Sequence, residues 1–181
     1  KRERYPENSE AVIQKMVESE VSGIAFSVHP VTEDYNQLII EAGLGLGEAI
    51  VSGQITPDSY VVEKKPRNIL DKNVSAQDRG LFRAPNSPFV KGSTRSGRDF
   101  KSSALLGTSF IKGGIKENNI WLEVPKEKGA SQKLSDSQIL ELSDLILKIE
   151  KHYGFPCDIE WALEAKKFYI VQSRPITTLK K

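Results

Sequence analysis

Two polar residues near the C-terminus could bind one metal ion between them. The segment 158–179 alternates apolar and polar residues on both sides of 165–167, a pattern that predicts a β-hairpin. With a three-residue loop at 165–167, Glu160 on the first strand faces Gln172 on the second. Directly opposed residues have Cβ atoms about 4.5–5.5 Å apart, so the Glu160 carboxylate and the Gln172 amide oxygen could hold the same ion.

The same register adds a cation beside this pair. It places Glu164 opposite Phe168 and Asp158 opposite Arg174. Magnesium prefers hard oxygen ligands, usually one or two from protein and the rest from phosphates and water. The planar guanidinium of Arg174 could neutralise phosphate charge next to such an ion. The alternative is that Glu160 and Arg174 are ordinary surface charges, and a bulge in the hairpin would change the register.

A glycine-rich segment at 43–53, GLGLGEAIVSG, follows an apolar strand and is expected to open a short helix. Backbone amides at such a turn can approach phosphates closely. The segment is not a P-loop, because Gly-Lys-Ser/Thr is absent, and Glu48 stands where a dinucleotide-binding motif has its third glycine. Gly43, Gly45 and Gly47 are equally compatible with a tight turn whose residues have positive φ.

The segment 11–17, AVIQKMV, has the composition of a strand that could lie against an adenine ring. Met16 and Val17 are apolar, and the backbone edge of this strand would be free to pair. Glu18 and Glu20 follow directly and could reach ribose hydroxyls. The alternative, which is the more common case, is a core strand followed by solvated turn residues.

The apolar periodicity predicts the elements that must position these side chains. Ser135 and Gln138 form a capping box at the start of an expected helix, and Gly154 ends that helix. A tight turn at 18–20 is expected to join the first two strands. These features favour an α+β fold with a largely antiparallel sheet and a few helices. Strands are expected at 11–17, 21–28, 37–42, 59–64, 68–74 and 120–124, followed by the helix at 136–152 and the hairpin.

Residues 76–119 have no sustained period of either kind, and we interpret them as a long flexible insertion within a single domain, 1–181. Between residues 79 and 101 the only acid is Asp99. A basic loop could contact nucleic acid or an acidic partner, but a solvated, flexible loop is the favoured interpretation. The basic residues of this stretch are Arg79, Arg83, Lys91, Arg95, Arg98 and Lys101.

The composition excludes several classes of protein. The chain has 181 residues, of which 38% are hydrophobic and 28% charged, enough for a packed core. Its net charge of +2 gives no whole-molecule field that would draw it to nucleic acid or an anionic membrane. No apolar run approaches about 18 residues, no signal peptide is visible, and Cys157 is the single cysteine, so we expect a cytoplasmic protein. The first residue is Lys1, which suggests a piece of a longer polypeptide.

Four blocks of the sequence resemble the phosphoenolpyruvate synthase and pyruvate phosphate dikinase family. They are QKMV at 14–17, SGIAFSVHP at 22–30, IIEAGLGLGEAIVSGQITPDSYVV at 39–62 and DIEWALEAKKFYIVQSRPITT at 158–178. The blocks appear in order and cover most of the chain outside 76–119. A DIEW strand paired with a QSRP strand is highly specific to this branch, to which rifampin phosphotransferase and the glucan dikinases also belong. The resemblance implies the C-terminal subdomain of an ATP-grasp nucleotide-binding domain.

The resemblance also implies roles for particular positions. ATP and Mg²⁺ are the expected ligands. Glu160 and Gln172 look like the magnesium ligands, and Arg174 looks like the catalytic, phosphate-contacting base. The remaining nucleotide contacts implied by the resemblance are the adenine hinge Gln14, Lys15, Met16 and Val17, the ribose neighbour Glu18, and the pocket wall Glu41, Gly45 and Gly47.

In that family ATP phosphorylates a histidine on a separate domain, and a further domain passes the phosphoryl group to pyruvate. The expected partners are therefore ATP, an N-terminal ATP-grasp lobe and a phosphohistidine domain, with no membrane partner. His29 and His152 match no phosphohistidine motif, and the isolated chain is expected to be inactive. The alternatives are a rifampin phosphotransferase-like or other dikinase fragment, and a non-catalytic nucleotide-binding or partner module.

Overall fold

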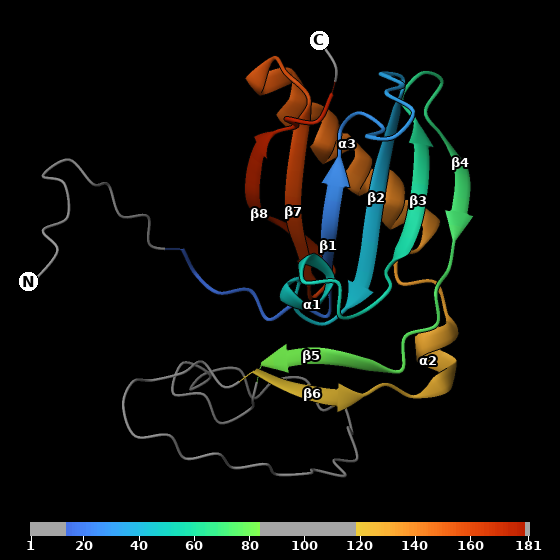
Figure 1. The fold of residues 1–181 in the computed structure, drawn as a ribbon, viewed down its shortest axis with the longest axis vertical. Helices are drawn as coiled ribbons and strands as arrows, with labels where there is room; N and C mark the ends of the chain where they lie inside the picture. The colour runs from blue at the N-terminus through green and yellow to red at the C-terminus, as the bar shows by residue number, and fades with distance from the viewer. Residues whose placement is uncertain (1–13, 84–118, 180–181) are drawn as a thin grey trace, which may run out of the picture.

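The computed structural model describes residues 14–83 and 119–179 of the chain. Along the sequence, runs of strands are interrupted by short helices and by one long helix, which is an α+β arrangement (Figure 1). Their bounds are β1 (Val21–Phe26), β2 (Gln37–Leu44), α1 (Glu48–Val51), β3 (Asp58–Glu63), β4 (Asn68–Asn73), β5 (Arg79–Arg83), β6 (Asn119–Glu123), α2 (Lys126–Ala130), α3 (Asp136–Tyr153), β7 (Cys157–Glu164) and β8 (Lys167–Pro175).

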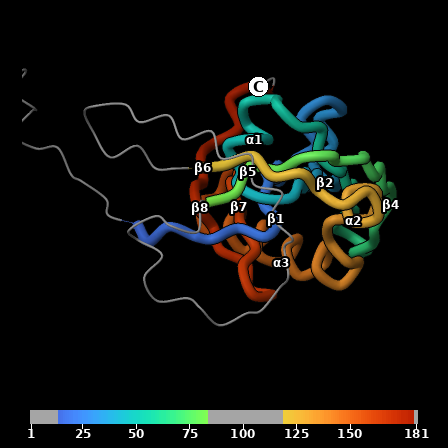
Figure 2. Tube along the Cα trace, turned by 90° about the horizontal axis from the view of Figure 1, so that it is seen from below, coloured from blue at the N-terminus to red at the C-terminus, as the bar shows by residue number. Residues whose placement is uncertain are grey.

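A six-stranded sheet in the order β4-β3-β2-β1-β7-β8 forms the body of the protein, and all of its neighbouring strands are antiparallel. A separate two-stranded ribbon, β5 with β6, lies across one end of this sheet (Figures 1 and 2). The expectation of an α+β fold with a largely antiparallel sheet is therefore confirmed.

The hydrophobic core lies between α3 and one face of the sheet (Figure 1). Because side chains alternate along a strand, every second residue of the central strands points into this core. On the opposite face the short helix α1 lies over Gly43 at one end, and we call this face the open face. The largest fully buried apolar side chains of the core are Leu38, Ile40, Tyr60, Val62, Leu134, Ile139, Leu142, Ile146, Ile159 and Trp161.

Helix α3 begins and ends where local signals predict. The Ser135 side chain accepts a hydrogen bond from the Gln138 amide, and the Gln138 side chain accepts one from the Ser135 amide, which completes the capping box. Gly154 ends the helix in the left-handed conformation, with φ of 76°. These hydrogen bonds join residues three or four apart, so the sequence alone carries the information.

The expected strand at 11–17 is wrong over its described part, because residues 14–17 form no strand; residues 11–13 lie outside the described residues. A hairpin partner would need a free edge on β1, but β1 already pairs with β2 on one side and β7 on the other. The chain enters the sheet only at Glu20, whose amide donates to the Leu163 carbonyl at 2.9 Å.

The prediction of an unstructured segment from residue 76 is wrong at its start. Arg79–Arg83 form β5, which pairs with β6 at the other end of the segment, and residues 84–118 lie outside the described residues. Five residues around a glycine carry too weak an alternation to reveal a strand. The Gln77 side chain anchors the start of β5, since it accepts from the Leu44 amide at 2.8 Å and donates to the Leu44 carbonyl at 2.9 Å.

The hairpin of β7 and β8 has the predicted pairs in the site, although its loop differs from the expected one. The turn contains two residues, Ala165 and Lys166, both with positive φ, rather than three. Glu164 therefore faces Lys167, and Phe168 faces Leu163, so the expected pairing of Glu164 with Phe168 is wrong.

A bulge restores the register further along the hairpin. Between Glu160 and Trp161 the pairing shifts by one residue, and Val171 on β8 is the extra residue. The bulge compensates for the shorter turn, so Glu160 faces Gln172 and Asp158 faces Arg174, as predicted.

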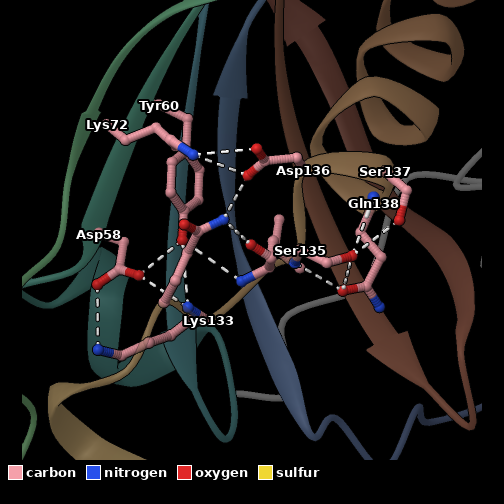
Figure 3. A network of polar contacts seen from close by, with 10 residues as sticks. Asp58, Tyr60, Lys72, Lys133, Ser135, Asp136, Ser137 and Gln138 are labelled. Carbon is pink, nitrogen blue, oxygen red and sulfur yellow. Dashed lines mark hydrogen bonds and ion pairs between the residues drawn. The ribbon is translucent and has the colours of Figure 1, made fainter.

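A buried polar cluster ties the α2–α3 connection to the sheet (Figure 3). The Lys133 ammonium lies 3.1 Å from Asp58 Oδ1, and both side chains are fully buried. The Tyr60 hydroxyl donates to Asp58 Oδ2 at 2.6 Å. Nothing in the sequence marked this cluster, because Lys133 stands in a polar segment and its burial depends on residues more than 50 positions away.

Candidate functional site

Four residues form a row across the middle of the open face. Ile24 on β1 faces Glu41 on β2 and Glu160 on β7, and Glu160 in turn faces Gln172 on β8. Adjacent strands are about 4.8 Å apart, so the backbones carrying Glu41 and Glu160 are separated by about 10 Å. The half-buried Ile24 lies between the two carboxylates. The row thus offers one oxygen pair, Glu160 with Gln172, and a separate acid, Glu41.

The neighbouring row carries an ion pair. Arg174 Nε donates to Asp158 Oδ2 at 2.8 Å, and Arg174 Nη2 lies 2.8 Å from the same oxygen. The hydrogen bond to Asp158, followed by its charge, raises the pKa of Arg174 above its usual value. Arg174 therefore stays charged on the open face, beside the Glu160 and Gln172 pair.

The donor set of the open face fits a hard divalent cation that keeps other ligands. Among the described residues no group of three or more His, Cys, Asp or Glu side chains could hold a metal by itself. Glu160 and Gln172 supply two oxygens, and this is the number that Mg²⁺ usually takes from a protein when phosphates and water complete its shell. The residues present are thus compatible with magnesium brought by a phosphate ligand.

Glu41 differs from the other acids of the site. Burial raises the pKa of its carboxyl above the usual value, since desolvation disfavours the charged form. A hydrogen bond to this partly desolvated carboxyl group is electrostatically stronger than one to a fully solvated acid.

Hydrogen bonds to neighbouring segments of the chain hold the backbone of the glycine-rich segment in place. The Gly45 amide donates to the Glu20 carbonyl at 3.1 Å, the Leu46 amide donates to the Leu81 carbonyl at 2.7 Å, and Ser22 Oγ donates to the Gly45 carbonyl at 2.6 Å. The Gly45 and Leu46 amides are therefore engaged within the chain. Gly47 is the N-cap of α1, a helix of only four residues.

Replacement of Gly45 by alanine is expected to destabilise the fold strongly. Gly45 has φ of +94°, and a Cβ there would lie 2.2 Å from the Leu81 carbonyl oxygen. Gly53→Ala is the matched control, because Gly53 also has positive φ, at +70°, but a Cβ there would meet nothing within 4 Å. The control should cost about 1–2 kcal/mol, the ordinary penalty of the left-handed region. Urea denaturation that finds equal losses for the two variants would contradict this account of Gly45.

The expected adenine hinge lies beside β8. Gln14 Nε2 donates to the Val171 carbonyl at 3.3 Å, so the hinge contacts the bulge next to Gln172. Lys15 and Met16 are exposed, while Val17 and Glu18 are half-buried. Segment 14–20 reaches β1 at the end of the sheet that carries the ribbon (Figures 1 and 2).

A separate cavity of about 720 Å³ lies between the loop after α1, the segment before β5, and α2. None of the candidate site residues lines it. The open face is the better candidate because it brings the Arg174 guanidinium next to the side-chain oxygens of Glu160 and Gln172.

Comparison with known proteins identifies the class of this domain. Residues 5–181 match the family described as pyruvate phosphate dikinase, AMP/ATP-binding domain. The chain therefore belongs to this family.

The chain is also similar to individual members of this class. It is 42% identical over 171 residues to a probable phosphoenolpyruvate synthase of Methanocaldococcus jannaschii, covering 94% of this chain and 12% of that protein. It is 43% identical over 172 residues to the phosphoenolpyruvate synthase of Pyrococcus furiosus, covering 94% of this chain and 18% of that protein.

A third relative differs in its named activity. The rifampicin phosphotransferase of Bacillus subtilis is 36% identical over 168 residues, covering 93% of this chain and 16% of that protein. The chain thus spans less than a fifth of the length of each of these three relatives. These matches confirm the resemblance to the phosphoenolpyruvate synthase and pyruvate phosphate dikinase family, and the family description confirms the expectation of its ATP-binding part. Among the described helices, none has the length and apolar content of a membrane span.

Proposed function

We propose that this chain is the C-terminal half of an ATP-grasp-type domain and binds magnesium and ATP on its open face. The observation that carries the proposal is the pairing of Glu160 with Gln172 next to the Arg174 guanidinium, in a chain of this family. Two oxygen ligands and one fixed cation on a single face match the needs of a magnesium-bound polyphosphate.

Each residue of the site has a distinct task in this proposal. Glu160 and Gln172 hold the metal, which when bound would neutralise part of the charge on the phosphates. Arg174 binds a phosphate oxygen through its N–H groups, and its guanidinium is charged at neutral pH as in any arginine. Glu41 forms part of the wall of the nucleotide site.

The nucleoside is proposed to lie at the ribbon end of the open face. The backbone of 14–17 would contact the adenine, with Glu18 near the ribose. The Gln14 contact to the Val171 carbonyl supports this arrangement, because it holds the hinge segment next to the metal ligand Gln172. The Gly45 and Gly47 backbone would then form part of the wall rather than a phosphate cradle, since the Gly45 amide is already engaged.

The full-length protein is proposed to transfer a phosphoryl group from ATP to a histidine on another domain, and from there to pyruvate. A second lobe would cover the open face and complete the nucleotide site, and a cytoplasmic location belongs to the same proposal. The named relatives that are phosphoenolpyruvate synthases support pyruvate as the acceptor.

A rifampicin-type acceptor is the second candidate. It is favoured by the 36% identity to a rifampicin phosphotransferase, although the identity to phosphoenolpyruvate synthases is higher. Acceptor specificity belongs to other parts of the full-length protein, so assays of that protein with pyruvate and with rifampicin would separate the two.

Calorimetric titration of the full-length protein with ATP, in the presence and absence of Mg²⁺, tests the proposed site. We expect measurable binding with magnesium and a clear loss of affinity when EDTA is present, because the metal joins the phosphates to Glu160 and Gln172. Inorganic sulfate is the control anion and should compete poorly. Binding that is indifferent to magnesium would contradict the proposed metal site, and no binding at millimolar ATP would contradict the proposed function.

A further inference from the structure

Asp158 is a buried acid on the open face that no assigned role explains. It lies two residues before Glu160 on β7, and its side chain is only 11% exposed. Its Oδ2 receives both contacts from Arg174, from Nε and from Nη2, at 2.8 Å each. Its Oδ1 is buried and has no hydrogen-bond partner among the described residues.

Asp58, the other buried carboxylate of the described chain, uses both of its oxygens, and so does the half-buried Glu150. Asp58 Oδ1 accepts from the Ser75 amide at 3.0 Å, and Asp58 Oδ2 accepts from Tyr60 and from the Lys133 amide. Glu150 contacts Lys64 through both oxygens, at 3.0 and 2.8 Å. These two acids have the full set of contacts expected of groups that stabilise a fold.

Asp158 does not have this pattern, and stability alone is a poor account of it. A buried acceptor without a partner costs free energy, and a pair with an exposed arginine returns little. The Arg174 side chain is 56% exposed, so the ion pair does little to hold the fold together. What the pair does provide is a fixed orientation for a long side chain that would otherwise sample many rotamers.

The geometry of the pair leaves part of the guanidinium available. Asp158 contacts the Nε and Nη2 edge, so the Nη1 amino group takes no part in the pair. Arg174 stands two residues beyond Gln172 on the same face of β8, about 7 Å along the strand. A phosphate bound through a metal at Glu160 and Gln172 would lie within reach of this group.

We propose that Asp158 is a positioning residue, whose buried carboxylate holds the Arg174 guanidinium so that its remaining N–H groups bind the phosphates of the nucleotide. The inference rests on the proposed function and adds to it a residue that acts only through Arg174. It therefore predicts that substitutions of Asp158 and Arg174 are not independent.

A double-mutant cycle on the full-length protein tests this coupling. The proteins are the parent, Asp158→Asn, Arg174→Gln and the double variant, each titrated with ATP and Mg²⁺ and, separately, with adenosine. We expect Asp158→Asn to weaken magnesium-ATP binding by about tenfold in the parent, the loss of one charge-assisted contact, and to have no effect when Arg174 is already glutamine. Adenosine affinity should be unchanged throughout, because adenosine has no phosphate.

Arg174→Lys is a second variant that leaves the buried position intact. Lysine keeps the charge but cannot make two contacts with Asp158 while presenting other donors, so it should lose about as much affinity as Arg174→Gln. Three results would each overturn the positioning role while leaving the proposed function in place. The first is an equal loss of magnesium-ATP affinity from Asp158→Asn in the parent and in the Arg174→Gln protein. The others are parent-like magnesium-ATP affinity of Arg174→Lys and a loss of adenosine binding. A parent protein that fails to bind magnesium-ATP would overturn both.

Discussion

Lys133→Met is expected to lower the free energy of unfolding by about 3–5 kcal/mol, the usual cost of removing one partner from a buried ion pair. The Lys133 ammonium is fully buried 3.1 Å from Asp58 Oδ1. It also donates to the Ser75 carbonyl at 2.6 Å and to the Gly129 carbonyl at 2.7 Å. Methionine has a similar volume but no donor, so two carbonyls and one carboxylate would lose a partner.

The remaining contacts of Asp58 cannot replace the missing charge. Burial and the neighbouring Asp58 raise the pKa of Tyr60, so its hydroxyl remains a proton donor to Asp58. Three hydrogen bonds would then surround a buried negative charge with no cation nearby. Because these contacts join β3, the chain after β4 and the α2–α3 connection, loss of Lys133 should loosen all three segments together.

Chemical denaturation in urea at neutral pH measures this effect, and Lys72→Met is the matched control. Lys72 pairs with Asp136 at 2.9 Å, but their side chains are 37% and 59% exposed. Exposed pairs contribute little to stability, so the control should unfold close to the parent. If the two methionine variants lost equally little stability, the buried pair would not be a main determinant of the fold.

Glu160→Ala combined with Gln172→Ala is expected to abolish the magnesium-dependent part of ATP binding in the full-length protein. The two side chains face each other across β7 and β8 and supply the only protein oxygens that we assign to the metal. Each single variant should weaken magnesium-ATP binding, and the double variant should bind ATP no better with magnesium than with EDTA. The fold should survive, because Glu160 is only half-buried and Gln172 is exposed.

Glu164→Gln is the matched control for this experiment. Glu164 lies on the same strand and face as Glu160 but at the hairpin end, opposite Lys167. The Glu164→Gln substitution should leave the magnesium dependence of ATP binding unchanged. Parent-like magnesium-ATP affinity of the double alanine variant, measured by the same calorimetry, would show that the metal assignment is wrong.

Several features of the site could be predicted from the sequence for reasons that remain valid in the structure. The alternation of apolar and polar residues on both sides of residue 165 predicts a hairpin, and a hairpin restricts which residues can face each other. The pairing of Glu160 with Gln172 is confirmed although the predicted loop is wrong, because a shorter turn and the bulge at Val171 offset each other. The predicted pair was right only because of this compensation, which no local pattern revealed.

Other features were decided by contacts between distant segments. The composition of residues 11–17 predicts a strand, yet the described part, 14–17, forms none, because β1 lies in the middle of the sheet with both edges occupied. Strand β5 exists because it pairs with β6, whose first residue is 36 positions beyond the last residue of β5. The unpaired oxygen of Asp158 likewise depends on how β7 and β8 pack, since its type and position alone would suggest an ordinary ion pair.

The sequence by itself determined the limits of α3, the existence of the final hairpin, the antiparallel α+β class and the family. The hydrogen bonds and hydrophobic contacts that cap a helix or close a hairpin turn join residues a few positions apart, so the residue types there are sufficient. Only the tertiary structure decided which strand occupies the middle of the sheet, where the bulge falls, that Lys133 is buried, and that Asp158 Oδ1 is buried without a hydrogen-bond partner among the described residues. These outcomes depend on burial and on partners many residues away, and a one-dimensional pattern contains neither.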